Sequence, residues 1–164
     1  MMAGSHVVVG IAAWIVVGPL LRYSPVDPVY LGLAVVGSLL PDVDHPASWV
    51  GRRSRPFSTV VAAVLGHRGF THSAMAVFGL VSLLVAAGYR HGTVSALAVG
   101  YLSHLAADML TPRGLRLAWP LRRTWSLPIC RTGSPMEGAI VFLLACAIVW
   151  WFLAFGWVRP WHRL

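Results

Sequence analysis

The sequence predicts an all-α membrane protein: a single domain over residues 1–164, built as a multi-pass bundle of four or five spans with a His/Asp cluster at one membrane face. Of the 164 residues, 57% are hydrophobic and only 11% are charged, which does not fit a soluble globule. The stretch from Gly138 to Val158 has 21 residues without a charge, enough to cross a bilayer core of about 30 Å. Apolar stretches recur near residues 6–21, 29–40, 73–89, 94–110 and 138–158.

The first two helices lead into the most polar stretch of the chain. Residues 6–21 form the first helix, which ends near Pro19 because proline cannot continue the hydrogen-bond ladder. Residues 29–40 form the second helix and end before Pro41, since the residue before a proline disfavours the α conformation. An irregular loop is expected after it, with three ionisable residues: Asp42, Asp44 and His45.

Two further helices precede the final span. The helix over 73–89 follows a Gly- and His-containing segment, and either Thr71 or Ser73 can cap it. The helix over 94–110 is expected to begin at Thr93, which can cap it in the same way.

Three segments are expected outside the spans. Residues 46–57 predict an interfacial loop with a basic cluster and a tryptophan anchor. The apolar run 58–65 is too short to cross, and we place it at the interface. The Pro- and Arg-rich segment 111–137 predicts a basic surface loop, with Glu137 at the N-terminal end of the final span, where a carboxylate favours the helix dipole.

Alternating helix directions bring the ionisable groups to one membrane face. The groups are His6, residues 42–45, 67–72 and 104–108. Of the 13 arginines, nine lie on this face and four on the opposite one. By the positive-inside rule, the face with the cluster is cytoplasmic. No basic residue precedes the first apolar run, so no cleavable signal peptide is expected.

These ionisable side chains predict a metal site. Such groups are costly at a membrane unless they are paired, hydrated or metal-bound, and carboxylates as close as Asp42 and Asp44 repel unless a cation or protons intervene. His104 and Asp108, four residues apart, lie on one face of a helix, which suits two ligands of one ion. The candidate ligands are His6, Asp42, Asp44, His45, His67, His72, His104 and Asp108.

The donor set also indicates the ion and its chemistry. His and Asp ligands without a thiolate suit zinc, manganese or ferrous iron better than calcium or magnesium. The surplus of donors implies two ions with a bridging carboxylate, an arrangement that activates water for attack on a phosphoester. Asp42, Asp44 and Arg68 are the candidate catalytic residues, and arginines would hold the anionic group.

Simpler interpretations stay open. The same His and Asp side chains can form a hydrogen-bonded structural network, and the arginines can be topology signals that contact lipid headgroups. His91 and His162 fall on the opposite face, and Asp27 is a turn residue between prolines, so none of the three is a candidate ligand. The net charge of +8 does not predict nucleic-acid binding, because arginine in a membrane protein is first a topology signal. Membrane lipids are the expected partners.

Four motifs in order resemble a known family. They are Ser5-His6 with Gly10, LLPDVDHP at 39–46, HRGFTHS at 67–73, and YLSHLAADMLTPRG at 101–114 followed by Trp119-Pro120. They cover roughly residues 3–128 and are similar to the YdjM-like family of bacterial inner-membrane proteins, described as metal-dependent hydrolases. That family is distantly similar to the zinc-dependent phospholipase C and nuclease superfamily, in which His and Asp side chains from helices hold zinc.

The resemblance implies roles for individual residues. It implies an early ligand at His6, a bridging carboxylate at Asp42 or Asp44, central histidines at His67 and His72, and a helical pair at His104 and Asp108. Glu137 has no accompanying histidine at the H-x-x-x-E spacing, so no third ion is implied. No counterpart is expected for the amino terminus that helps to bind metal in secreted members of the superfamily.

The sequence therefore predicts a membrane-bound metallohydrolase of the bacterial inner membrane, acting on a phosphoester of a lipid or lipid-linked molecule. The alternative is a non-catalytic membrane protein whose metal site is structural or regulatory and whose basic loop binds anionic lipid or a partner. A transporter would place its ligands near the bilayer midplane, whereas these lie at helix ends. The sequence leaves the substrate and the oligomeric state open.

Overall fold

A computed structural model of the chain describes residues 1–155, apart from residues 46–47, 54, 57–58, 60–68 and 122. Its elements are α1 (Ala3–Leu20), α2 (Pro28–Leu39), the 3-10 helix η1 (Leu40–Asp44), α3 (Trp49–Arg53), α5 (Ala74–Ala86), α6 (His91–Met109) and α7 (Pro135–Phe155). The described residues contain no strand, and Leu115 and Trp125 form an isolated antiparallel bridge. The all-α prediction is confirmed for this part of the chain.

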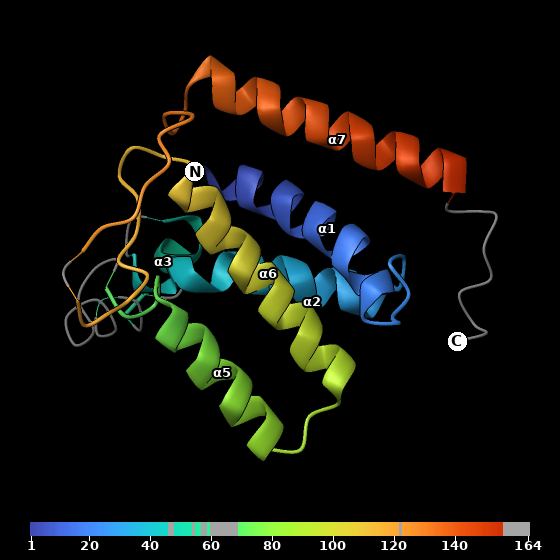
Figure 1. Cartoon of the computed structure of the whole chain (residues 1–164), viewed down its shortest axis with the longest axis horizontal. Helices are drawn as coiled ribbons and strands as arrows, with labels where there is room; N and C mark the ends of the chain where they lie inside the picture. The colour runs from blue at the N-terminus through green and yellow to red at the C-terminus, as the bar shows by residue number, and fades with distance from the viewer. Residues whose placement is uncertain (46–47, 54, 57–58, 60–68, 122, 156–164) are drawn as a thin grey trace.

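Helices α1, α2 and α6 pack against one another, with α5 beside α6 and α7 beside α1 (Figure 1). Small residues let α2 and α6 approach closely. A Cβ atom added at Gly100 would lie 2.0 Å from the carbonyl oxygen of Ala34, and one added at Gly37 would lie 2.3 Å from that of Leu97. The two helices therefore touch backbone to backbone, as small residues allow between membrane helices.

Successive long helices alternate in direction, and α7 runs parallel to α1 (Figure 1). We call the end where α1, α5 and α7 begin, and where α2 and α6 finish, the site end. Glu137 joins α7 to α1 there, because its fully buried carboxylate accepts hydrogen bonds from Ser5 Oγ at 2.6 Å and from the backbone N–H of Met2 at 2.8 Å. The first and last helices therefore begin side by side.

The prediction of four or five spans was wrong, because fewer helices than that are long and apolar enough to cross a bilayer. Among the described residues, only α1 and α7 are long and apolar enough to cross a bilayer. With 12 residues in α2 and 13 in α5, these helices rise about 18–20 Å, less than the bilayer core of about 30 Å. Helix α6 has 19 residues but carries polar side chains, including His104 and Asp108.

Local structure differs from the prediction at two helix ends. The residues after Pro41 form η1 rather than an irregular loop, because the proline lies in the first turn, where no N–H is required. Helix α6 begins at His91, so Thr93 lies inside the helix, and Arg90 occupies the cap position without a side-chain bond. Ser73 caps α5 as predicted, accepting a hydrogen bond from the N–H of Ala76 at 3.3 Å.

Segments outside the long helices agree in part with the prediction. The interfacial loop expected over 46–57 contains the short helix α3. Of the run 58–65, only Thr59 is described, so that prediction lies outside the described residues. The basic loop ends earlier than expected, since α7 begins at Pro135. Asp27 caps α2, accepting from the N–H of Val29 at 2.8 Å, which agrees with its predicted turn role.

Candidate metal centre

The orientation of His104 is fixed by the end of α2. Its Nδ1 lies 2.7 Å from the carbonyl oxygen of Ser38, and both residues are fully buried. A carbonyl oxygen can only accept, so Nδ1 must carry the proton of the neutral ring. The lone pair of His104 is therefore on Nε2, which faces the other ionisable groups.

His72, just before α5, is held in the same tautomer by a hydroxyl. Thr71 Oγ1 donates to Asp44 Oδ2 and lies 3.1 Å from His72 Nδ1. Because the hydroxyl proton goes to the carboxylate, Oγ1 accepts from Nδ1, and the lone pair of His72 is also on Nε2. Tyr101 fixes this segment from α6, with its hydroxyl 2.5 Å from the carbonyl oxygen of Thr71. Such outer contacts orient histidine ligands in metal sites.

The two Nε2 atoms face each other at 3.3 Å. Two lone pairs at that distance repel unless a proton or a cation lies between them. Two carboxylates complete the group. Asp108 Oδ2 is 3.8 Å from Nε2 of both His72 and His104. Asp42 Oδ1 is 4.0 Å from His72 Nε2 and 3.9 Å from His104 Nε2.

The two histidines with either carboxylate have nearly the spacing that a divalent cation needs. Tetrahedral zinc with bonds of 2.0–2.2 Å has ligand atoms about 3.3–3.6 Å apart. The five separations given above run from 3.3 to 4.0 Å, so each carboxylate lies close to this spacing from both histidines. We call His72, His104, Asp42 and Asp108 the four-ligand group.

His6 forms a second group with His104 and Asp108. Its ring stacks on that of His104 with centroids 3.7 Å apart, and its Nε2 lies 3.3 Å from Asp108 Oδ1. An Nε2 atom has one lone pair, so His104 can be a ligand of one ion only. Asp108, which turns Oδ2 to the four-ligand group and Oδ1 to His6, is therefore the residue placed to connect the two groups.

The amino group of Met1 also lies at this centre, 2.5 Å from Asp108 Oδ1. This contact differs from the expectation that no amino terminus would lie at the centre. As a cation beside a buried carboxylate, it compensates part of the negative charge of Asp108.

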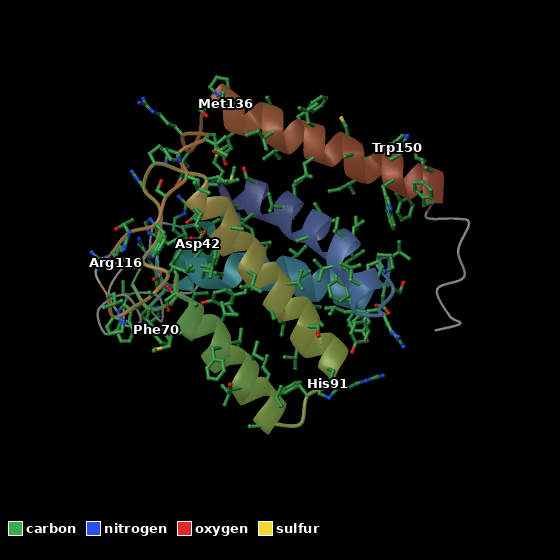
Figure 2. All side chains as sticks on the ribbon, viewed as in Figure 1. Asp42, Phe70, His91, Arg116, Met136 and Trp150 are labelled. Atoms are coloured by element: carbon green, nitrogen blue, oxygen red, sulfur yellow. The ribbon has the colours of Figure 1, made fainter. Side chains whose placement is uncertain are left out.

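Burial differs between the members of the cluster. His6, His72, His104 and Asp108 are buried, whereas the side chain of Asp42 is 14% exposed. Asp42 therefore lies on the exposed side of the four-ligand group, where water or a ligand would reach it. In Figure 2, Asp42 lies at the site end together with Phe70 and Arg116, far from His91 and Trp150 at the other end of the bundle.

Five of the eight predicted ligands come together in these two groups: His6, Asp42, His72, His104 and Asp108. Asp44 lies on the far side of His72, bonded to Thr71, and neither group includes it. His45 follows η1 as its cap residue and is in neither group. His67 and the candidate catalytic Arg68 lie outside the described residues.

Two residues of the centre were missed from the sequence. Thr71 appeared only as a possible helix cap, although it links Asp44 to His72. The carbonyl group of Ser38 could not be found from residue types, since every residue has one. The available signal for Thr71 was its place directly before a candidate histidine ligand.

The helices and the buried cluster define a membrane-associated helical protein with a possible metal centre. The chain belongs to the YdjM inner membrane protein family, whose model matches residues 1–162. This confirms the family and the inner-membrane location predicted from the sequence, and the two apolar helices fit that location. No solved structure matches the chain.

Individual relatives extend the comparison. The chain is 43% identical over 124 residues to inner membrane protein YdjM of Escherichia coli (strain K12) and equally to that of Shigella flexneri. That match covers 71% of this chain and 63% of each relative, so the chain spans less than two thirds of their length. It is 34% identical over 156 residues to uncharacterized protein YvsG of Bacillus subtilis (strain 168), covering 93% of this chain and 94% of the relative.

Proposed function

We propose that this inner-membrane protein is a metal-dependent hydrolase that cleaves a phosphoester. The observation that carries the proposal is the pair of Nε2 atoms of His72 and His104 facing each other at 3.3 Å, with carboxylates of Asp42 and Asp108 beside them. Both rings are oriented by groups behind them, which is how proteins prepare histidines for a metal. A site built only for hydrogen bonds would alternate donors and acceptors instead.

The residues divide the chemical work. A divalent ion bound by His72, His104 and Asp108 would keep a fourth position for water, make that water nucleophilic near neutral pH and polarise a phosphoryl oxygen. Asp42, at the exposed edge, is placed to accept a proton from the attacking water. Asp44 and Thr71 keep His72 in the ligand tautomer. His6 lies beside the other oxygen of Asp108, so these two residues would supply ligands for a second ion.

The substrate class follows from the position of the cluster. The cluster lies at helix ends, in a membrane protein, next to an arginine-rich loop that follows α6 directly. Anionic headgroups concentrate at such a surface and are attracted by arginine. A lipid or lipid-linked phosphoester presented at the cytoplasmic leaflet is therefore the substrate that we propose.

One observation favours a second function, a non-catalytic protein with a structural metal site. Three of the four members of the four-ligand group are buried, and structural sites are closed by protein ligands on all sides. In that case the ion would hold α6, η1 and the start of α5 together, and the arginine-rich loop would bind lipid or a partner.

Metal content tests both functions. Mass spectrometry of detergent-purified wild-type protein is expected to show at least one zinc, manganese or iron ion per chain, and His104→Ala is expected to lose it. Asp27→Asn is the matched control. It also changes a residue that carries a hydrogen bond, but Asn caps helices as well as Asp does, so its metal content is expected to stay at the wild-type level.

Activity then separates the two functions. With metal bound, a panel of phosphodiester and phospholipid substrates is expected to be hydrolysed by the wild type and not by Asp42→Asn. Bound metal without hydrolysis of any of them would favour the structural site. Folded protein that retains no metal after dialysis against zinc would contradict both.

A further inference from the structure

A pocket at the site end is lined by two arginines and two threonines. Its volume is about 380 Å³, within the range of small-ligand sites, and its lining residues are Thr111, Pro112, Arg113, Arg131 and Thr132. None of the candidate metal ligands lines it. It begins three residues after Asp108, to which it is joined by the hydrogen bond from Thr111 Oγ1 to the carbonyl oxygen of Asp108 at 2.8 Å.

Two turns build the pocket from distant parts of the loop. On one side, the N–H of Gly114 donates to the carbonyl oxygen of Thr111 at 3.0 Å, and the positive φ of Gly114 (57°) allows the tight turn that carries Arg113. On the other, the N–H of Ser134 donates to the carbonyl oxygen of Arg131 at 3.0 Å.

Backbone hydrogen bonds hold the second side against the end of α6. The N–H groups of Ile129 and Cys130 both donate to the carbonyl oxygen of Leu110, at 3.0 and 3.1 Å. Ser126 Oγ donates to the carbonyl oxygen of Thr111 at 2.7 Å. The two arginines therefore come from separate turns that are both attached to the end of α6.

The two arginines of this pocket have no acidic partner among the described residues. Neither Arg113 nor Arg131 forms an ion pair there, and the pocket lining has no acidic residue. The hydroxyl of Thr132 also has no described partner. Two guanidinium groups with a nearby hydroxyl are the donors that recognise a phosphate group, because arginine can bind two phosphate oxygens at once.

We propose that the pocket between Arg113 and Arg131 binds a phosphate group, supplied either by a lipid headgroup or by a water-soluble phosphate. Thr111, which lines the pocket, follows Asp108 by three residues, so a phosphate held here would lie near the end of α6 that carries Asp108. The phosphate is part of the substrate only if the proposed hydrolase function holds. Binding of phosphate in the pocket needs no metal and does not depend on that function.

Binding is measured on metal-free full-length protein, so that its failure is separate from failure of the hydrolase proposal. Two probes are used: inorganic phosphate, followed by titration calorimetry in neutral detergent, and nanodisc-embedded protein with phosphatidic acid added to phosphatidylcholine. The variant Arg113→Gln/Arg131→Gln is compared with Arg116→Gln/Arg123→Gln, which removes the same charge from exposed arginines of the same loop outside the pocket.

At least one probe is expected to bind, with affinity falling about tenfold or more in Arg113→Gln/Arg131→Gln and less than threefold in the control, since a charged hydrogen bond contributes about 1.5–3 kcal/mol. Binding of inorganic phosphate would identify a water-soluble phosphate as sufficient, and binding of phosphatidic acid alone would identify a lipid headgroup. Binding of neither probe, or equal loss in both double variants, would overturn the proposal.

Discussion

At the scale of single residues, the centre depends on which nitrogen of each histidine carries the proton. Ser38 fixes His104 through a backbone carbonyl that no substitution removes. His72 is fixed through the side chain of Thr71, which can be changed. The two histidines therefore differ in how easily their metal affinity can be altered.

Thr71→Val is expected to weaken metal binding about 10–100-fold, the usual effect of removing an outer contact of a histidine ligand. Valine has the shape of threonine but cannot accept from His72 Nδ1, so the ring loses its preferred tautomer. Asp44 loses the hydrogen bond from the hydroxyl of Thr71. The dissociation constant is measured by competition with a chromogenic zinc chelator.

Thr71→Ser is the control, because it keeps the hydroxyl and is expected to bind metal within about threefold of the wild type. If the valine variant bound as tightly as the serine variant, the hydroxyl would have no part in preparing His72.

At the scale of elements, the centre requires α2 and α6 to touch. The carbonyl group that orients His104 is at the end of α2, while His104 itself is on α6. Gly100 lies one turn before His104, at the point where the two backbones meet. The glycine thus determines the distance between the two partners.

Gly100→Ala is expected to destabilise the protein by about 1–3 kcal/mol, as overpacking usually does, and to lower metal affinity as well. The added Cβ would lie 2.0 Å from the backbone oxygen of Ala34, which cannot give way without moving α2. Thermal unfolding in detergent, with and without zinc, measures both effects.

Gly32→Ala is the matched control in α2, since a Cβ added there has no atom within 4 Å. It is expected to leave stability unchanged or raise it by up to about 1 kcal/mol, because alanine suits a helix better than glycine. Equal destabilisation in both variants would mean that the close contact is not the cause.

The sequence predicted the helical elements well and their detail less well. Long apolar runs bounded by prolines and polar clusters are local signals, so each long helix was found near its true place. The start of α6 was misplaced because Thr93 is a good cap by type, yet Arg90 occupies that position. Capping depends on the path of the preceding chain, which residue type does not reveal.

The sequence predicted the centre through its ionisable residues, which are conspicuous in an apolar chain. His6, Asp42, His72, His104 and Asp108 could be found for that reason. The separate position of Asp44 could not, because neighbouring residues of a 3-10 helix point in different directions and its exact course was unknown. The contact of Met1 with Asp108 joins residues 107 positions apart and gives no local signal.

At the scale of the whole molecule, the parallel course of α1 and α7 limits the topology. Both helices begin at the site end (Figure 1). If both helices cross a bilayer, they cross it in the same direction, and the chain has to return to the site end between them. The membrane orientation can therefore be tested at both ends of the bundle.

Single cysteines introduced in a Cys130→Ala/Cys146→Ala background are expected to differ in labelling by a membrane-impermeant maleimide. Arg90→Cys lies at the His91 end and is expected to react in intact spheroplasts, whereas Arg116→Cys lies at the site end and is expected to react only after lysis (Figure 2). We expect this pattern because the site end has more arginines than the other end, and arginine-rich loops stay on the cytoplasmic side of the membrane. The reverse pattern, or labelling of both before lysis, would contradict this orientation.

The short lengths of α2 and α5 have a consequence for the lipid around the protein. Helices that rise about 18–20 Å cannot match a hydrocarbon core of about 30 Å, and such a mismatch is relieved by local thinning of the bilayer. We expect the leaflet next to the site end to be depressed toward the cluster. A headgroup diffusing laterally into that depression would arrive level with Asp42 without having to leave the membrane.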